Sequence, residues 1–294
     1  MRKLKFAIFG NEYQAEKSSA INTLLSVLAS RDAEVYMERL FYDFLTRELK
    51  QDVAVEGVFD SYNFDADFVI SMGGDGTFLK AANRVGAKGT PIIGINTGRL
   101  GFLADAMPSE ISDAIAHIYN NEYETEARAV IKVEADGENI EGSPYALNDI
   151  AVLKRDNASM ISIRVSINDE PLVTYQADGL IISTPTGSTA YNLSNGGPII
   201  IPKAGILCLT PVAPHSLSIR PIVISDNSVI KLEVASRSHN FLVAIDGRSE
   251  KLVESTTLTV SRAPFSTNII KCCNHRYFST LREKLMWGAT FTKD

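Results

Sequence analysis

The hydrophobic pattern of this chain changes near residue 125, and that change constrains the fold more than any other feature. Before it, apolar runs typical of strands alternate with apolar residues at helical spacing. The strand-like segments are Lys5–Gly10, Ala33–Met37, Asp67–Met72 and Pro91–Asn96, and the helix-like segments are Tyr13–Ser30, Leu40–Leu49, Phe78–Val85 and Ser109–Tyr119. This alternation is typical of βαβ units built around a parallel sheet. We therefore predict an α/β domain over residues 1–124.

After residue 125, apolar and polar residues alternate one by one, as in residues 161–167 and 230–234. A period of two indicates strands with one buried face. The dipeptides Asp136-Gly137 and Asp246-Gly247 are typical of hairpin turns between such strands. We predict a β-rich, largely antiparallel and sandwich-like domain over residues 125–262.

Two segments fall outside these patterns. Residues 263–294 form a tail in which Phe278–Met286 has helical spacing, and we expect this helix to return to the first domain. Residues 51–64 are poorly patterned, and we expect them to form a mobile loop.

Composition excludes several classes of protein. The chain has 294 residues, of which 45% are hydrophobic and 22% charged, and its net charge is −6. Without a basic surplus, nucleic acid is not expected as a partner. The three cysteines and four histidines lack the spacing of a zinc site or a disulfide framework. We expect the adjacent Cys272 and Cys273 to be reduced thiols in a cytoplasmic protein. With no apolar run near the ~18 residues of a membrane span and Asn11 interrupting the first short one, we expect neither membrane segment nor secretory signal.

The sequence Gly73-Gly-Asp75-Gly76-Thr77 lies between a predicted strand and a predicted helix. Ligand sites of α/β proteins form at the carboxyl ends of such strands, and a helix N-terminus suits phosphate. The carboxylate of Asp75 would repel phosphate, so it needs another purpose, such as binding a hydroxyl, accepting its proton or contacting a nucleotide's metal ion. The alternative is a tight turn with Asp75 as the helix N-cap. The P-loop and GxGxxG patterns are absent here.

A second polar segment, residues 184–194, follows the strand-like residues 179–183 and reads TPTGSTAYNLS. Its hydroxyls and free amides form a dense set of donors for a polar ligand, and Tyr191 offers a ring for stacking. The alternative is a capped helix start, although capping requires only one or two such side chains.

Two further segments are weaker indications of a site. Asn148 and Asp149 lie between strand-like flanks, where a strand end or a bulge would also explain them. Residues 94–103 form a glycine-rich loop after a strand, which is either a connection or part of a ligand site.

Taken together, these motifs resemble those of the NAD kinase family. The matching segments are GGDGT at 73–77, NTGRLGFL at 96–103, ND at 148–149, DG at 178–179 and TPTGSTAYNLS at 184–194. The resemblance implies an enzyme that phosphorylates the 2′-hydroxyl of the adenosine ribose of NAD to give NADP. It implies ATP or another phosphoryl donor, a divalent metal such as Mg²⁺ carried mainly by the donor phosphates, and NAD bound between the two domains. It also implies a homo-oligomer, a dimer or a tetramer.

The resemblance assigns roles to individual residues. Asp75 would be the catalytic base, or would orient the hydroxyl, and Phe102 would flank the adenine. Asp178 would contact the nicotinamide end or its ribose. The remaining residues would line the nucleotide site, and they are Gly76, Lys80, Asn148, Asp149, Thr189, Ala190, Tyr191, Asn192, Leu193 and Ser194. For Lys80 a solvated helix face is an alternative. Asp246-Gly247 also matches an IDG sequence of the family, but the hairpin turn explains it adequately.

Two other functions stay open at this point. The GGDGT sequence also occurs in lipid kinases and phosphofructokinase-like enzymes, although the chain shows no basic amphipathic membrane helix. A dinucleotide sensor without turnover is the second alternative, and the carboxylate of Asp75 argues against it. The sequence leaves open the preferred donor, the choice between NAD and NADH, feedback by NADP(H) and the number of subunits.

Overall fold

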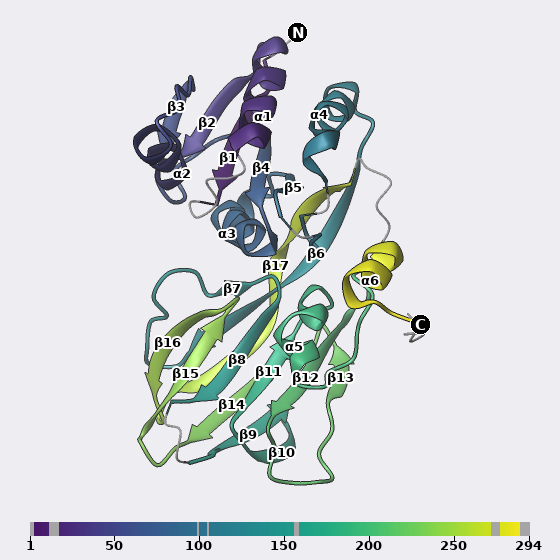
Figure 1. Cartoon of the computed structure of the whole chain (residues 1–294). Coiled ribbons are helices and arrows are strands. Elements are labelled where there is room, and N and C mark those ends of the chain that lie inside the picture. The colour runs from purple at the N-terminus through teal and green to yellow at the C-terminus, as the bar shows by residue number, and fades with distance from the viewer. Residues whose placement is uncertain are drawn as a thin grey trace, which may run out of the picture. The chain divides into compact units, whose positions relative to one another are not determined.

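The computed structural model describes residues 3–11, 18–98, 100–104, 106–155, 159–271 and 277–288. The chain divides into two compact units (Figure 1). Unit 1 comprises residues 1–127 and 267–294, and unit 2 comprises residues 128–266.

Unit 1 is built on a parallel sheet. Its strands are β1 (Lys5–Gly10), β2 (Glu34–Glu38), β3 (Gly57–Phe59), β4 (Phe68–Gly73) and β5 (Ile92–Asn96). They lie in the order β3-β2-β1-β4-β5, and every pair is parallel. The order therefore reverses between β1 and β4, which is where ligands bind in open α/β sheets.

Helices cover this sheet. They are α1 (Ser18–Ser30), α2 (Arg39–Asp43) with a π-helical turn (Phe44–Glu48), α3 (Asp75–Val85) and α4 (Ile111–Asn120), with 3₁₀ turns at Gly86–Lys88 and Pro108–Glu110. A further helix of this unit, α6 (Tyr277–Leu285), comes after the last strand in the sequence. Buried side chains of α1, α2 and α4 pack with alternate strand residues such as Phe6 and Ile8, while α3 contacts β1, β4 and β5. The predicted α/β domain with a parallel sheet is confirmed.

Three segments of unit 1 bear on the expectations from the sequence. The segment 51–64 is not simply a loop, because it contains β3 and buries Val53 and Phe59. A strand of three residues is too short to show periodicity in the sequence. The predicted helix before Ser30 is described from Ser18 onward, and residues 12–17 lie outside the described residues. The tail helix is confirmed as α6, and it belongs to unit 1.

Unit 2 contains two antiparallel sheets. One has β10 (Glu170–Ala177), β9 (Ile161–Ile167), β14 (Ile230–Ala235) and β17 (Thr257–Lys271), joined by β6 (Glu124–Ala135) and β7 (Tyr145–Ala146). The other has six strands in the order β13 (Ile222–Ser225), β12 (Ile206–Val212), β11 (Gly179–Ser183), β8 (Asp149–Lys154), β15 (Asn240–Ile245) and β16 (Arg248–Val253). Short helical turns, Thr186–Thr189 and α5 (Tyr191–Ser194), follow β11.

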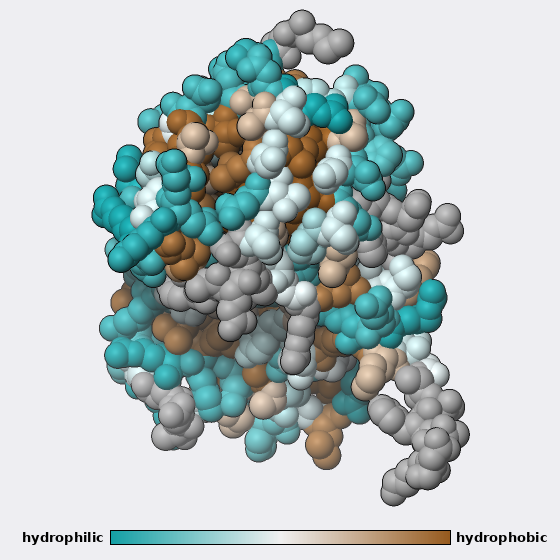
Figure 2. Space-filling model, turned by 45° about the horizontal axis from the view of Figure 1, so that its top comes forward, coloured by the Kyte–Doolittle hydropathy of each residue, from teal (hydrophilic) through white to brown (hydrophobic). Residues whose placement is uncertain are grey.

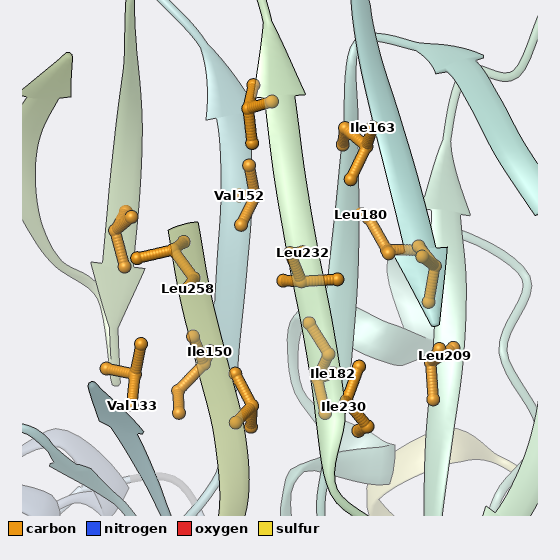
Figure 3. Close-up of a cluster of buried hydrophobic side chains, with 14 of the residues drawn as sticks. Val133, Ile150, Val152, Ile163, Leu180, Ile182, Leu209, Ile230, Leu232 and Leu258 are labelled. Atoms are coloured by element: carbon orange, nitrogen blue, oxygen red, sulfur yellow. The ribbon is translucent and has the colours of Figure 1, made fainter. Parts of the chain in front are cut away.

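The two sheets of unit 2 share one hydrophobic core. The first sheet contributes Ile163, Leu232 and Leu258 to it, and the second contributes Ile150 and Ile182. All of these side chains belong to a single buried cluster (Figure 3). The alternation that predicted these strands thus corresponds to side chains that point inward, and the predicted sandwich is confirmed.

Turns and the last strand complete unit 2. Asp246 and Gly247 join β15 to β16 with φ angles of 47° and 82°, which is the positive-φ pair of a tight hairpin turn, as predicted. Asp136-Gly137 instead opens a longer connection from β6 to β7. β17 continues beyond Arg262 to Lys271, so its last residues belong to unit 1, where Ile269 pairs with β5.

Hydrophilic residues cover much of the face shown in Figure 2, with smaller hydrophobic patches between them. Within the described part of the chain, no helix combines the length and the hydrophobicity needed to cross a bilayer.

Candidate functional site

The GGDGT segment forms the junction between β4 and α3 at the point where the strand order reverses. Gly73 ends β4, Gly74 is the N-cap residue of α3, and Asp75 is its first helical residue. The N-cap interpretation of Asp75 is therefore wrong, and its side chain is directed elsewhere. A carboxylate in the first turn also interacts favourably with the positive end of the helix dipole.

The carboxylate of Asp75 is held by the glycine-rich loop that follows β5. Its Oδ2 accepts a hydrogen bond from the amide of Phe102 at 3.0 Å, and its Oδ1 accepts from the amides of Leu103 at 2.9 Å and Ala104 at 3.2 Å. Three bonds to one carboxylate fix both its position and its orientation. The two motifs GGDGT and NTGRLGFL, separate in the sequence, thus form one site.

Glycines make this arrangement possible. A Cβ on Gly101 would lie 2.1 Å from Oδ1 of Asp75, and a Cβ on Gly94 would lie 2.6 Å from Cα of Ala104. By contrast, a Cβ on Gly74 or Gly76 would meet nothing within 4 Å. The first pair is required by packing inside the protein, whereas the second pair leaves open space beside Asp75 for a substrate.

Lys80 lies one turn further along α3. Its Nζ is 2.9 Å from Oε2 of Glu38, a buried residue at the end of β2. Lys80 is therefore not on a simple solvated face, because it compensates a buried carboxylate at the carboxyl edge of the sheet. Whether it also contacts nucleotide stays a prediction.

The tail helix α6 brings further side chains to the Asp75 site. The rings of Phe102 and Tyr277 lie 6.1 Å apart between their centroids, and Nζ of Lys284 is 5.1 Å from the centre of the Phe102 ring. The same ammonium lies 3.5 Å from Oδ2 of Asp75. An aromatic ring, a carboxylate and a cation thus meet at one place in unit 1.

In unit 2 the Asn-Asp motif is fixed by a residue distant in sequence. Oδ2 of Asp246 accepts the amide of Leu147 at 2.8 Å, and its Oδ1 accepts the amides of Asn148 at 2.8 Å and Asp149 at 3.2 Å. In return, the amide of Asp246 donates to the carbonyl of Asp149 at 3.1 Å. The hairpin turn therefore has a second purpose, because its carboxylate shapes the segment that precedes β8.

Burial changes the chemistry of this motif. Burial, and then the negative charge of Asp246, raise the pKa of Asp149 from 3.8 to about 7. Burial also raises the pKa of Asp246, although three amide hydrogen bonds and Arg248 oppose the rise. Within the described residues, the side-chain oxygen of Asn148 is buried and accepts no hydrogen bond. An unpartnered amide and a carboxyl near neutrality are typical of a ligand site.

Three of the six hydroxyl side chains of the TPTGSTAYNLS segment form hydrogen bonds within the protein. Thr184 Oγ1 donates to the carbonyl of Leu147 at 2.6 Å, and Ser188 Oγ donates to the carbonyl of Pro185 at 2.7 Å. Thr184, Thr186 and Ser188 are all buried. These hydroxyls therefore stabilise the turn after β11 rather than forming the donor set that the sequence indicated.

Asn192 is likewise part of the interior. It is fully buried, its Nδ2 donates to the carbonyls of Ser188 and Pro198, each at 3.2 Å, and its Oδ1 accepts from Thr210 at 2.6 Å. Tyr191 and Ser194 are exposed, whereas Thr189, Ala190 and Leu193 are half-buried. The residues able to meet a ligand are thus those around Asn192 and not Asn192 itself.

Asp178 lies apart from this group. It precedes β11, whereas the Asn-Asp motif lies beside the other end, where Ser183 pairs with Asp149. Oδ1 of Asp178 forms an ion pair with Lys154 at 2.8 Å. The structure does not bring Asp178 together with Asn148 and Asp149, and its contact with the nicotinamide end stays a prediction.

Comparison with known proteins connects this geometry with a family. The family model of the ATP-NAD kinase N-terminal domain matches residues 6–123, and that of the ATP-NAD kinase C-terminal domain matches residues 147–272. The NAD kinase of Bacteroides fragilis is 59% identical over 286 residues, covering 97% of this chain and 99% of that relative. The chain belongs to the NAD kinase family. It is therefore an enzyme, a phosphotransferase that acts on NAD.

Other NAD kinases extend the comparison. The NAD kinase of Porphyromonas gingivalis is 44% identical over 285 residues, covering 97% of this chain and 98% of that relative. The structure of an NAD kinase from Archaeoglobus fulgidus in complex with ATP has a TM-score of 0.76 and 26% identity, covering 96% of this chain and 99% of that one. Yeast NADH kinase complexed with NADH shares the fold, with a TM-score of 0.87, 21% identity and coverage of 99% of this chain and 90% of that one. The lipid-kinase and sugar-kinase alternatives are thereby set aside.

Two residues of this candidate site were not assigned to it from the sequence. Asp246 was explained by its hairpin turn, and nothing local indicated that its carboxylate reaches residues 147–149. Lys284 lies in a tail without a recognised motif. The pairing of β15 with β8 would have indicated the first contact, whereas no sequence pattern indicated the second.

Proposed function

We propose that Asp75 accepts, or orients, the proton of the 2′-hydroxyl on the adenosine ribose of NAD while the γ-phosphoryl group of ATP passes to that hydroxyl. The observation that carries this proposal is the carboxylate itself, fixed by three amides at the point where the strand order reverses. Phosphoryl transfer depends mainly on positioning and charge stabilisation. A carboxylate held in one orientation supplies the positioning.

The residues of unit 2 are proposed to bind the dinucleotide. Asn148 offers an unpartnered amide oxygen, and Asp149 a carboxyl that titrates near neutrality. Tyr191 presents an exposed ring, with Thr189, Ala190 and Ser194 beside it in the sequence. Together they supply hydrogen bonds and a stacking surface, which is what recognition of a base and a ribose requires.

A divalent cation, Mg²⁺ in our proposal, fits this site as part of the donor nucleotide. Among the described residues, no three His, Cys, Asp or Glu side chains are arranged to hold a metal ion. Mg²⁺ usually keeps several waters and is bound largely through substrate phosphates rather than by a dedicated protein site, so the donor phosphates would carry it. The cation would neutralise charge on the donor phosphates.

We further propose that the protein is cytoplasmic and forms a homo-oligomer, a dimer or a tetramer. The buried thiol of Cys208 is free, as expected in a reducing compartment. The oligomeric state is proposed from the resemblance to the NAD kinase family. Light scattering of the purified protein tests the oligomeric state.

The Asp75→Asn variant tests the catalytic role. General-base assistance is worth about 10²–10⁴-fold, so NADP formation should fall by that factor while the affinity for NAD changes little. Asp113→Asn is the matched control, because Asp113 is also an acidic residue in the first turn of a unit 1 helix but is exposed. NADP is measured with a coupled dehydrogenase, and NAD affinity by calorimetry.

Two results would contradict the proposal. Turnover of Asp75→Asn close to that of the parent would remove Asp75 from the mechanism. Binding of NAD by the parent protein without NADP formation in the presence of ATP and Mg²⁺ would favour a sensor.

A further inference from the structure

We propose that Lys284 is a second catalytic side chain, whose ammonium contacts the phosphoryl group as it passes to the acceptor hydroxyl. The proposal rests on the role assigned to Asp75. It extends the catalytic site to the C-terminal helix α6, which no motif of the sequence connected with catalysis.

The position of Lys284 is defined by several contacts within unit 1. Its Nζ lies 3.5 Å from Oδ2 of Asp75 and 5.1 Å from the centre of the Phe102 ring. The helix that carries it buries Thr280 and Leu281, and its Tyr277 ring contacts Phe102. Phe102 in turn donates its amide to Asp75, so α6, the glycine-rich loop and the carboxylate are linked through one residue.

The hydrogen bonds of Asp75 indicate where a substrate hydroxyl would bind. A carboxylate has about four acceptor positions. Oδ1 already accepts from Leu103 and Ala104, whereas Oδ2 accepts from the amide of Phe102 and, at a long 3.5 Å, from Nζ of Lys284. The longest, and therefore weakest, of these four contacts is the one from Lys284 to Oδ2, so a substrate hydroxyl would bind Oδ2 in its place. A hydroxyl bound there would have its oxygen roughly 2.7 Å from Oδ2, close to the ammonium.

The group transfer then places new charge beside Lys284. The hydroxyl oxygen forms a bond to the γ-phosphorus, its proton passes to Asp75, and the bond from that phosphorus to the β–γ bridging oxygen breaks, with the electron pair leaving on ADP. Asp75 becomes neutral as the phosphoryl oxygens approach. The ammonium thus loses one anionic partner and gains another, and a cation so placed stabilises the transition state.

The other lysine of this site is engaged differently. Lys80 pairs with the buried carboxylate of Glu38 at 2.9 Å, so its charge compensates a group within the protein. Lys284 pairs with the carboxylate that the reaction itself would neutralise. This difference assigns the phosphoryl contact to Lys284.

The experiment compares Lys284→Met, Lys284→Arg and the control Arg282→Met in the whole chain. Arg282 is exposed on the same helix, so its replacement removes an equal charge away from Asp75. Loss of one electrostatic contact to a transition state costs about 10²–10³-fold in kcat. We expect that loss for Lys284→Met, with the KM for NAD within about threefold of the parent. Lys284→Arg should retain most of the activity, and Arg282→Met all of it.

The outcomes separate this proposal from the preceding one. A kcat for Lys284→Met near or above that of the parent would overturn it, and a raised kcat would show that Lys284 restrains Asp75. Two further results would overturn the proposal because they would indicate a structural role for Lys284. One is a fall in kcat that Lys284→Arg does not rescue, and the other is an equal fall in Arg282→Met. The Asp75→Asn variant is assayed in parallel. If its kcat does not fall, the role assigned to Asp75 is wrong, and this result is independent of those for the Lys284 variants.

Discussion

Asp149 is expected to destabilise unit 2 at neutral and alkaline pH. Its pKa is raised from 3.8 to about 7 in the folded protein. Between these two values the folded chain binds more protons than the unfolded chain, so the free energy of unfolding falls as the pH rises. Below about pH 4 both states are protonated, and above about pH 7 both are ionised. At about 1.36 kcal/mol per pH unit, the total loss is roughly 4 kcal/mol.

The Asp149→Asn variant removes this titration while keeping a side chain of the same shape. We expect it to be more stable than the parent at pH 8 by up to about 4 kcal/mol, and at pH 5 by less than about 2 kcal/mol. Hydrogen exchange over a guanidinium series, measured on peptides that cover β8, reports the unfolding of unit 2. Hydrogen exchange of peptides that cover β4 follows unit 1 separately.

Asp178→Asn is the matched control. Asp178 is a third exposed and pairs with Lys154, so its replacement should change stability by less than about 1 kcal/mol, and equally at both pH values. If Asp149→Asn gains no stability at pH 8, or gains as much at pH 5 as at pH 8, burial does not raise the pKa of Asp149 in the way argued.

Three further substitutions test other parts of the site. Gly101→Ala would place a Cβ 2.1 Å from Oδ1 of Asp75 and should lower kcat about 10²-fold by displacing the carboxylate; an unchanged kcat in the NADP assay would contradict this. Asn192→Ala should lower the free energy of unfolding by about 2–4 kcal/mol, because buried partners such as Thr210 lose their bonds; lost NAD affinity with unchanged stability would instead indicate a ligand contact. Tyr191→Ala should raise the KM for NAD about tenfold and leave that for ATP unchanged, whereas an equal change in both would indicate a scaffold role.

Much of the fold was predictable because its segments are long enough to show a period. The alternation over residues 161–167 predicted β9, and apolar residues at helical spacing predicted α4. β3 was missed because three residues show no period. Its place in the sheet is set by pairing with β2, and such pairing leaves no local trace in the sequence.

The site was predictable in its motifs but not in the direction of its side chains. Asp75 was identified, but its three amide partners were not, because they lie in the loop that follows the next strand in the sequence, β5. Asn192 was expected to face a ligand, but a helix of four residues gives no period from which to separate its buried side from its exposed side. The position of Asp246 in a hairpin turn was enough to explain its presence. For that reason the hydrogen bonds of its carboxylate to the amides of residues 147–149 were not predicted.

The path of β17 has a consequence for synthesis of the protein. Residues 257–266 belong to unit 2, and the strand then supplies residues 267–271 to unit 1. A ribosome therefore completes all of unit 2 before it makes the last strand and helix of unit 1. A nascent or truncated chain that stops before residue 267 lacks both the part of β17 that pairs with β5 and the helix that carries Lys284. Such fragments would lack part of the catalytic site, which would confine efficient phosphorylation of the coenzyme to finished molecules.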